Sequence, residues 1–332
     1  MTRDYNILLS EGTVLHAEYI EKLRDLNIEE VYIADPPTPP AQSLHIMKEE
    51  TKNLLSEQVK GIIEKHTYHK NDELIELCKT ADSIIENILE EDKVVETVYD
   101  IKDRNTNIYE HSVNICSLSI IVALKLHLTR DQIHDIGVGC LLHDIGLRYV
   151  TVPYINQNLS DMREYELAEF KKHPIYGFTA LKEEPWITDR CKNIILYHHE
   201  RIDGSGYPLR ATDIPIECEI VGVCDIFDEM ICGIGYTRSK VYEAVEFLKN
   251  SKSIYYSKQL VETLLQFIAV YPVGSQVITN TGELAIVIKQ NNQFPERPIL
   301  RVIKDKYGIL VNDVLILDMI KMHSVFIDKV IY

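Results

Sequence analysis

Apolar residues recur at helical spacing through most of the chain between residues 101 and 270. The pattern predicts helices at 108–127, 130–142, 164–172, 188–199, 217–230, 240–249 and 258–270. Thr129 and Ser239 are residue types that cap helix N-termini, and we expect them to cap the second and the sixth of these helices. No alternating run long enough for a sheet interrupts this region, which is therefore predicted to be an all-α core.

Residues 41–100 also show helical spacing, as at Leu74, Leu77 and Ile84, but they are strongly charged. We interpret them as a helical connector. Its helices either form the contacts of a homodimer or cover the core with a solvated face, and the sequence leaves both interpretations open. The histidines at positions 45, 66 and 69 lack an apolar setting or a carboxylate close by in the sequence, so they are predicted to be surface residues.

The two ends of the chain predict smaller modules. Residues 1–40 indicate a mixed α/β module with a strand at 5–9, a helix at 17–26, a strand at 31–33 and a stiff proline-rich linker at 35–40. From residue 271, segments rich in β-branched residues at 275–279, 284–289, 299–303 and 325–331 predict a small antiparallel β-barrel that extends to residue 332. The predicted fold class is therefore mainly α, with an all-α helical bundle core at 101–270 between two small modules.

Charge and composition narrow the function classes. The formal net charge of −16 argues against a partner such as long nucleic acid, whose phosphates need a basic surface. A small phosphorylated ligand is still possible, because bound cations invert the local charge. The seven cysteines form no CxxC pair, and their odd number excludes a complete disulfide framework, which favours a reducing cytoplasm. We find no signal-peptide core, and the most apolar run, 118–124, is too short for membrane insertion.

The adjacent pair His143-Asp144 ends the second predicted helix and is the first candidate for chemistry. Neighbouring side chains on a helix point about 100° apart, so the carboxylate can lie between two cations while the imidazole binds one. Such a pair also arises by chance. His111 lies near the start of a helix with apolar later turns, where one histidine is more often a core residue than a ligand. His173 precedes Pro174, so we expect its backbone outside the helical region and its ring at a helix boundary.

A second group of candidates is harder to explain as core packing. His198 and His199 end a predicted helix and precede a turn in which Gly204 and Gly206 give the backbone freedom to come close to another group. Asp225 interrupts the apolar run 220–227, where an unpaired carboxylate would be strongly unfavourable on burial. A bound metal would remove that penalty.

Together these side chains indicate a metal site. They offer imidazole and carboxylate without thiolate, a set that suits manganese, iron, zinc or nickel and argues against a cysteine zinc site. A bridging Asp144 implies two metals roughly 3.5–4 Å apart, with a shared water that is deprotonated near neutral pH. The sequence contains neither a phosphate-binding GxxxxGK[ST] loop nor a GxSxG elbow. We therefore expect a two-metal centre that hydrolyses a phosphodiester.

The order of these residues, with His-His-Glu-Arg-Ile-Asp-Gly-Ser-Gly-Tyr-Pro at 198–208, resembles the HD-GYP subgroup of the HD phosphohydrolases over about residues 101–250. The resemblance implies an all-α domain that hydrolyses cyclic di-GMP to pGpG or to GMP. It also implies a metal centre of two ions that share one bridging carboxylate. The residues that match the first ion's ligands are His111, His143 and Asp225, those that match the second ion's ligands are His173, His198 and His199, and the bridging, catalytic residue is Asp144.

The chain departs from the pattern of this family at three places. Members with three metals carry a glutamate four residues before the first histidine, where this chain has Asn107, so we expect two ions. A lysine near the scissile phosphate is common where this chain has Leu147, with Arg148 next to it. Two arginines usually grip the substrate phosphates where Ile234 and Thr237 stand here.

Loss of bidentate arginine–phosphate contacts weakens substrate positioning but leaves the metal chemistry intact. Arg238 is one residue beyond the second of these positions and can partly substitute for it. The candidate substrate-binding residues are Arg148, Gly206, Tyr207, Pro208 and Arg238.

Our leading hypothesis is a metal-dependent phosphodiesterase that uses two iron or manganese ions, with zinc or nickel as alternatives, and a metal-bridged hydroxide to cleave cyclic di-GMP. A second hypothesis is a catalytically weak or inactive signalling adaptor or nucleotide receptor in which the metals are structural. A third is a phosphohydrolase of another nucleotide, with a pocket reshaped by Leu147 and Ile234. Metal content and a substrate panel separate the three.

Overall fold

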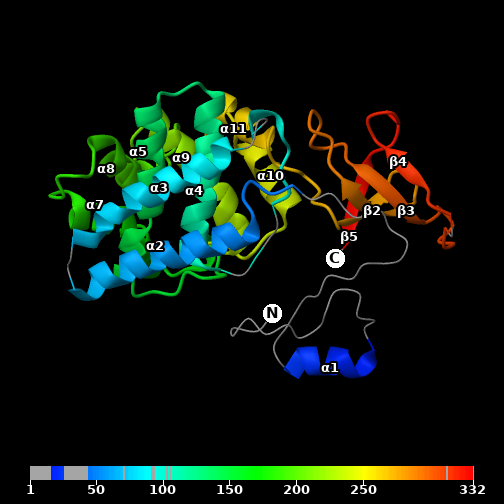
Figure 1. Ribbon diagram of the computed structural model, residues 1–332, viewed down its shortest axis with the longest axis horizontal. Coiled ribbons are helices and arrows are strands. Elements are labelled where there is room, and N and C mark those ends of the chain that lie inside the picture. The colour runs from blue at the N-terminus through cyan, green and yellow to red at the C-terminus, as the bar shows by residue number, and fades with distance from the viewer. Residues whose placement is uncertain are drawn as a thin grey trace. The chain divides into compact units, whose positions relative to one another are not determined.

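The computed structural model describes residues 16–25, 44–69, 72–90, 94–101, 104, 106–311 and 313–331. The chain divides into two compact units, Met1–Ala41 and Gln42–Tyr332. The described part of the first unit contains helix α1, Ala17–Asp25, close to the helix predicted at 17–26 (Figure 1). The strands predicted at 5–9 and 31–33 and the linker at 35–40 lie outside the described residues.

The second unit is mainly helical, and its helices follow the prediction closely. Two helices lie in the connector region, α2 (Glu49–His69) and α3 (Glu76–Leu89). The core contains α4 (Ile108–Lys125), α5 (Arg130–Leu142), α6 (Glu164–Phe170), α7 (His173–Leu181), α8 (Asp189–Tyr197), α9 (Ile216–Cys232), α10 (Val241–Ser251) and α11 (Lys258–Leu265). Short 3₁₀ segments lie between them: η1 (Asp72–Ile75), η2 (Val94–Glu96), η3 (Ile145–Tyr149) and η4 (Leu159–Asp161). Among the described residues, none of these helices is long and apolar enough to cross a membrane.

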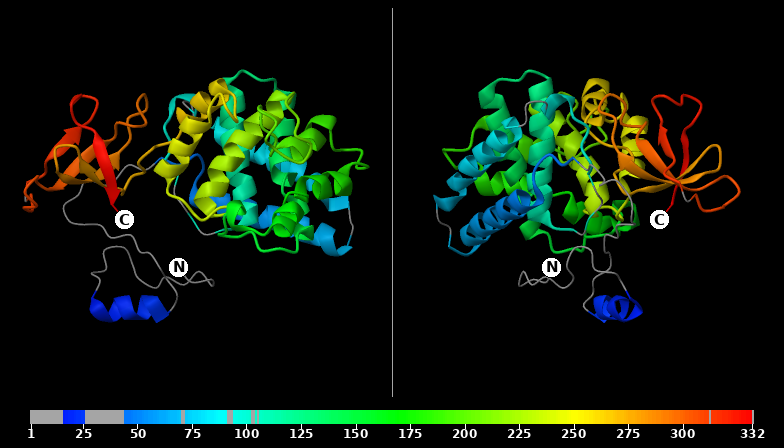
Figure 2. Two further views of the ribbon diagram at one scale, coloured as in Figure 1. Left: turned by 180° about the vertical axis from the view of Figure 1, so that it is seen from behind. Right: turned by 45° about the vertical axis from the view of Figure 1, so that its right-hand side comes forward.

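Helix α9 lies at the centre of the bundle, in contact with α4, α5, α8, α10 and α11. Every residue of α9 from 220 to 232 is buried. Most residues of α9 are apolar, and a helix that buries them on all sides must be surrounded by other helices, which places α9 in the interior. Figure 2 shows from two further sides that the helices pack around one another, whereas the strands form a sheet of their own.

Local sequence signals explain most helix starts. Thr129 caps α5 as predicted, and its side chain accepts from the backbone of Gln132 while the Gln132 side chain accepts from the backbone of Thr129. The prediction for Ser239 is wrong, because α10 begins at Val241 and Lys240 holds the cap position. Here the Glu243 carboxylate accepts from the Lys240 backbone N–H at 2.8 Å, which satisfies a helix-end donor without a serine.

Helix α7 was not expected from the sequence. The prediction that His173 lies outside the helical region is wrong, since His173 is the first residue of α7 and Pro174 falls in its first turn. Proline is tolerated there because the first backbone N–H groups of a helix have no intrahelical acceptor. The prediction of a ring presented at a helix boundary still holds for His173.

The C-terminal residues form a five-stranded antiparallel sheet in the order β4-β3-β2-β1-β5. Its strands are β1 (Gln276–Thr279), β2 (Leu284–Lys289), β3 (Ile299–Lys304), β4 (Ile316–Asp318) and β5 (Ile327–Ile331). The small antiparallel module is confirmed, but the predicted barrel is wrong. In the described part of the chain β4 pairs with β3 alone and β5 with β1 alone, so the sheet has two edges and stays open. A strand as short as β4 offers few backbone groups for closure.

The buried carboxylate of Asp100 joins the start of the connector to the sheet module. Its Oδ2 accepts from the Leu44 backbone N–H at 3.1 Å, and its Oδ1 accepts from the Val273 N–H and from Gln290 Nε2, both at 2.8 Å. Asp100 is 3% exposed. Asp100 therefore satisfies three donors from three segments that are distant in the sequence, as a buried carboxylate requires.

We expect Asp100→Asn to lower the free energy of unfolding by about 1–3 kcal/mol, because the new amide N–H₂ would face a buried donor. Urea denaturation followed by circular dichroism measures the change. Asp328→Asn is the matched control on an exposed position of β5, and it should have almost no effect. Equal stability of Asp100→Asn and the wild type would show that Asp100 is not a structural junction.

Candidate metal centre

The structure brings all seven predicted ligands together in the interior of the helical bundle. Each comes from the end or the buried face of a helix: His111 from α4, His143 and Asp144 from the end of α5, His173 from the start of α7, His198 and His199 from the end of α8, and Asp225 from α9. All are buried except His199, whose side chain is 11% exposed. Helix ends supply four of the five histidines because a ring there can turn inward without crowding the next turn.

One group of ligand atoms surrounds the Oδ1 atom of Asp225. This atom lies 3.1 Å from His111 Nε2 and 3.5 Å from His143 Nε2. The Oδ2 atom of Asp144 faces the same pair of rings, at 3.7 Å from His111 Nε2 and 3.3 Å from His143 Nε2. Two imidazoles and two carboxylates thus converge here, and the ligand atoms of His111, His143 and Asp225 all lie within 4.8 Å of one another, close enough to hold a metal ion.

A second group lies on the other side of Asp144. Its Oδ1 atom lies 3.3 Å from His173 Nε2 and 3.9 Å from His198 Nε2, and His199 belongs to the same group. The two oxygens of Asp144 therefore face different groups of imidazoles. This is the arrangement that a bridging carboxylate requires.

Hydrogen bonds fix which nitrogen of each ring faces inward. The Nδ1 atoms of His143, His173 and His198 lie 2.8–3.0 Å from the backbone carbonyls of residues 140, 170 and 195. A carbonyl can only accept, so each Nδ1 carries the proton and donates. The Nε2 lone pairs of the neutral rings are then free to bind a metal, as in most histidine ligands.

The donor atoms fit a cation and lack other partners. Among the described residues, both carboxylate oxygens of Asp225 and the Nε2 atoms of His111, His143 and His199 are buried without a hydrogen bond. The Nε2 atoms of His173 and His198 lie 3.2 Å apart, so two lone pairs oppose each other unless a cation or a proton lies between them. Imidazole and carboxylate together suit iron, manganese, zinc or nickel.

The pKa values reflect the same crowding. Burial lowers the pKa of His143, but the carboxylates of Asp144 and Asp225 outweigh it and raise the pKa to about 9. For His198, burial and the neighbouring His143 lower the pKa to about 3. Burial would raise the pKa of Asp144, yet the imidazoles of His143 and His173 hold it well below its usual range. Without metal, protons on some of the imidazole rings therefore balance the negative charges of the two carboxylates.

Two glycines allow the ligand-bearing segments to approach. A Cβ on Gly146 would lie 1.9 Å from the backbone oxygen of His173, and a Cβ on Gly206 would lie 2.5 Å from the backbone nitrogen of Arg201. Any larger residue at position 146 would therefore separate η3 from α7, and with them Asp144 from His173. Both glycines that the sequence singled out need their conformational freedom. Gly204 has a positive φ of +76°, and Gly206 lies close to the backbone nitrogen of Arg201.

The candidate substrate residues fall into two groups. Tyr207 stacks on His199 with ring centroids 4.6 Å apart, between the buried Gly206 and Pro208, which follows a cis peptide bond. Arg148 instead lies with its guanidinium 5.5 Å from the ring centroid of Tyr149. Arg238 is exposed, and its backbone N–H donates to Asn156 Oδ1 at 2.9 Å. Roles in substrate binding stay predictions for all five.

The positions that depart from the family pattern are occupied structurally. Leu147 packs with Met162 and Phe170 in a small apolar cluster, and Ile234 is fully buried. Asn107 caps α4, where its Oδ1 accepts from the backbone N–H groups of residues 109 and 110 at 3.1 and 3.2 Å.

Sequence reasoning missed four polar residues beside the centre. Asp228 accepts from His111 Nδ1 at 2.7 Å and also pairs with Arg104. Glu229 is buried, with its Oε1 atom 3.9 Å from His199 Nε2, and burial together with Asp225 and Asp144 holds its pKa well above the usual range. The Nζ atom of Lys171 lies 5.3 Å from the ring centroid of Tyr207. The argument that singled out Asp225, a carboxylate in an apolar run, applies equally to Asp228 and Glu229 and would have found them.

Comparisons with known proteins agree with this fold and this centre. Residues 96–260 match the family model of the HD domain, and residues 276–332 match that of a KOW domain associated with the HD domain. Residues 96–260 of the chain thus form an HD domain. Its resemblance to the HD-GYP subgroup is confirmed as well. A solved structure of an HDG"Y"P protein from Bdellovibrio bacteriovorus, 24% identical, aligns with a TM-score of 0.55 over 64% of this chain and 70% of that one, and has the same fold.

Curated relatives are named as cyclic-dinucleotide phosphodiesterases. A cyclic di-GMP phosphodiesterase of Pseudomonas aeruginosa is 28% identical over 225 residues, which are 67% of this chain and 54% of that protein. A 3'3'-cGAMP-specific phosphodiesterase of Vibrio cholerae is 34% identical over 130 residues, 38% of this chain and 24% of that protein. The chain thus spans about half of the first relative's length and less of the second's.

We expect added Mn²⁺ or Fe²⁺ to raise the Tm of metal-free protein, because an ion that binds only the folded chain stabilises it by about 2.7 kcal/mol at a hundred times its Kd. The gain should grow as the pH rises toward 9, because the pKa of His143 is about 9 and protons compete with metal for its Nε2. Differential scanning fluorimetry with and without EDTA measures it. An unchanged Tm with manganese, iron, zinc and nickel across this pH range would contradict a metal centre.

Proposed function

We propose that this chain is a metal-dependent phosphodiesterase that hydrolyses cyclic di-GMP to pGpG, to GMP or to both. The observation that carries the proposal is the division of the seven candidate ligands into two groups that share Asp144. The family assignment and the names of the curated relatives support it. In the same proposal, residues 1–40 are an N-terminal module, 41–100 a helical connector, 101–270 the hydrolytic domain and 271–332 an appended β module.

In this proposal two divalent ions, most readily iron or manganese, occupy the centre. His111, His143 and Asp225 would hold the first ion, His173, His198 and His199 would hold the second, and Asp144 would be shared between them. When bound, such ions lower the pKa of a shared water and offset the negative charge that develops on the phosphoryl oxygens.

The chain's own residues prepare this site in three ways. Backbone carbonyls hold the rings of His143, His173 and His198 with their Nε2 atoms inward, so no reorientation is needed when substrate arrives. Buried apolar helices exclude bulk water from the ligands, which strengthens every charge interaction among them. The ring of Tyr207, stacked on His199, gives a flat face beside the second group.

The positive charge of Lys171 beside Tyr207 suits the phosphates of the substrate. Lys171 is partly buried over the Tyr207 ring, and burial together with the positive charges of Arg201 and Arg210 lowers its pKa. Lys171 therefore places a positive charge beside the Tyr207 ring in a protein whose overall charge is −16. We propose that Lys171 takes over part of the phosphate binding that Leu147 and Ile234, both buried in apolar surroundings, cannot provide.

A phosphodiesterase for a different cyclic dinucleotide is the alternative that two observations favour. The similarity to a 3'3'-cGAMP-specific phosphodiesterase, and the apolar side chains at two positions that usually bind phosphate, both point to an altered substrate pocket. A receptor without turnover, a homodimer through residues 41–100 and a cytoplasmic location stay predictions from the sequence.

We expect Asp144→Ala to abolish phosphodiesterase activity and to reduce bound metal from about two ions per chain to one or none, because each group loses a shared oxygen. The assay incubates manganese- or iron-loaded protein with cyclic di-GMP, 3'3'-cGAMP, linear dinucleotides and mononucleotides, and metal is counted by mass spectrometry. Asp131→Ala, an exposed carboxylate on α5, is the control. Wild-type turnover by Asp144→Ala would exclude the bridging role, and absence of turnover on the whole panel by metal-loaded wild type would exclude the enzyme.

We expect Lys171→Met to raise KM for the cyclic dinucleotide by roughly 10- to 100-fold, the value of a charge-assisted phosphate contact. Metal content should not change, because Lys171 contacts Tyr207 and is not a candidate ligand. Lys172→Met removes an adjacent exposed lysine that pairs with Glu169 at 3.1 Å, and it should leave KM unchanged. Equal KM values for the two variants would rule out a phosphate contact at Lys171.

A further inference from the structure

The ring of His111 is held differently from the other histidines of the centre. Its Nδ1 donates to Asp228 Oδ2 at 2.7 Å, whereas the Nδ1 atoms of His143, His173 and His198 donate to backbone carbonyls. A carboxylate is a stronger acceptor than a carbonyl, and it makes the opposite nitrogen of the ring a better metal ligand. The binding strength of His111 therefore depends on a charged side chain outside the ligand set.

Asp228 is itself held by a second charge. It is fully buried on α9, and its Oδ2 atom also accepts from a guanidinium N–H of Arg104. Arg104 is only 14% exposed, so this ion pair is largely removed from water. Without Arg104 the buried carboxylate would be uncompensated, and it would move or take up a proton.

The charges continue outward to the connector helix α2. Arg104 Nε lies 3.1 Å from Glu110 Oε1, and the same oxygen lies 3.0 Å from Lys52 Nζ on α2. Lys52 and Glu110 are each 18% exposed. Four side chains of alternating charge thus link α2 to His111.

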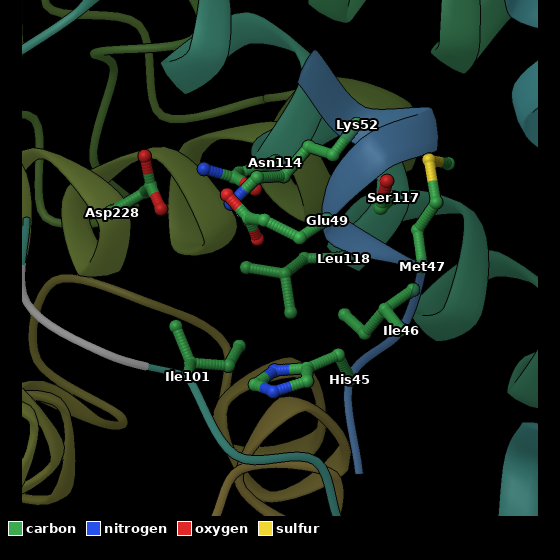
Figure 3. Close-up of a pocket in the computed structure, with 10 residues that line it drawn as sticks. All are labelled: His45, Ile46, Met47, Glu49, Lys52, Ile101, Asn114, Ser117, Leu118 and Asp228. Atoms are coloured by element: carbon green, nitrogen blue, oxygen red, sulfur yellow. Dashed lines mark ion pairs between the residues drawn. The ribbon is translucent and has the colours of Figure 1, made fainter. Parts of the chain in front are cut away.

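A cavity lies where α2 meets this network. It has a volume of about 60 Å³, and its lining includes Glu49 and Lys52 of α2, Asn114 of α4 and Asp228 of α9 (Figure 3). The side chains of Lys52 and Glu49 and that of Asp228 approach it from opposite sides. α2 therefore lies beside the buried carboxylate that orients His111, with space into which side chains of either helix can move.

We propose that Asp228 and Arg104 are positioning residues for His111, that they set the affinity of one ion of the pair, and that Lys52 and Glu110 connect this setting to α2. The inference rests on the proposed two-ion centre. Because backbone carbonyls orient the rings of His143, His173 and His198, the effect is confined to the ion bound by His111, and a movement of α2 changes that ion's affinity without reshaping the centre.

A purely structural role for the network predicts a different pattern. If Arg104 and Asp228 only join the segment around residue 104 to α9, their loss lowers Tm and affects both ions equally or neither. A positioning role instead weakens one ion selectively. It also makes the effect of Arg104 dependent on the presence of Asp228.

The test titrates Mn²⁺ into metal-free full-length protein, with the free ion followed by electron paramagnetic resonance. We expect Asp228→Asn to weaken one of two binding steps by roughly 10- to 100-fold and to leave the other within about twofold. Arg104→Met should weaken the same step, and its addition to Asp228→Asn should cause no further loss. Lys52→Met should weaken that step by a smaller factor. Arg190→Met is the control, because Arg190 pairs with Asp135 and Glu217 away from the centre.

A second measurement does not depend on affinity. In zinc-loaded protein, the proton and nitrogen-15 resonances of the His111 Nδ1–H group report its hydrogen bond. We expect both resonances to move toward the values of the other rings in Asp228→Asn. The same shift is expected in the variant that combines Asp228→Asn with Arg104→Met. This double variant removes both buried charges, so neither is left uncompensated and the folded protein can still be tested.

The outcomes separate this inference from the proposed function. Any of three results would overturn the positioning role. Asp228→Asn could bind two ions with wild-type affinity, it could weaken the binding of both ions equally, or Arg104→Met and Asp228→Asn could act independently. Wild-type protein that binds no metal would overturn the two-ion centre itself.

Discussion

The two oxygens of Asp144 face two different groups of imidazoles, and the rest of the helical bundle is arranged around that division. His143 and Asp144 are adjacent in sequence at the end of α5. The ring of His143 nevertheless belongs to one group of ligand atoms, while the two oxygens of Asp144 face both groups. This geometry requires α4 and α9 on one side and α7 and the end of α8 on the other. The packing of five helices thus places a single carboxylate between the two groups of imidazoles.

Such a centre is unfavourable unless its charges are balanced. Buried lone pairs and carboxylates oppose one another, and in water-free surroundings these repulsions are strong. Bound cations would relieve these repulsions at the centre itself, and the guanidinium of Arg104 balances the charge of the next carboxylate outward, Asp228. The bundle therefore holds layers of alternating charge, from the ligands through Asp228 and Arg104 to the surface pair Glu110 and Lys52. Stability and metal affinity depend on the same contacts.

The chain keeps the complete ligand set while it replaces side chains that usually bind phosphate. Leu147 and Ile234 are not exposed substitutes but buried members of the core. In the proposed function, substrate contacts come from other positions, and Lys171 is a cation that the fold places beside Tyr207. Chemistry and specificity are thus carried by different parts of the molecule, and specificity can change without loss of the metal site.

The sequence by itself determined the features that depend on local chemistry. Helix positions follow from apolar spacing and from caps such as Thr129, and the seven ligands follow from residue types that are costly to bury alone. It did not determine α7, because a proline in a first turn and a proline that ends a helix look alike in a linear pattern. Only the tertiary structure decided which oxygen of Asp144 faces which ring, that Asp228 supports His111, and that the sheet stays open. These depend on contacts between residues far apart in the chain, as with Asp228 and His111, and local propensities contain no information about such distances.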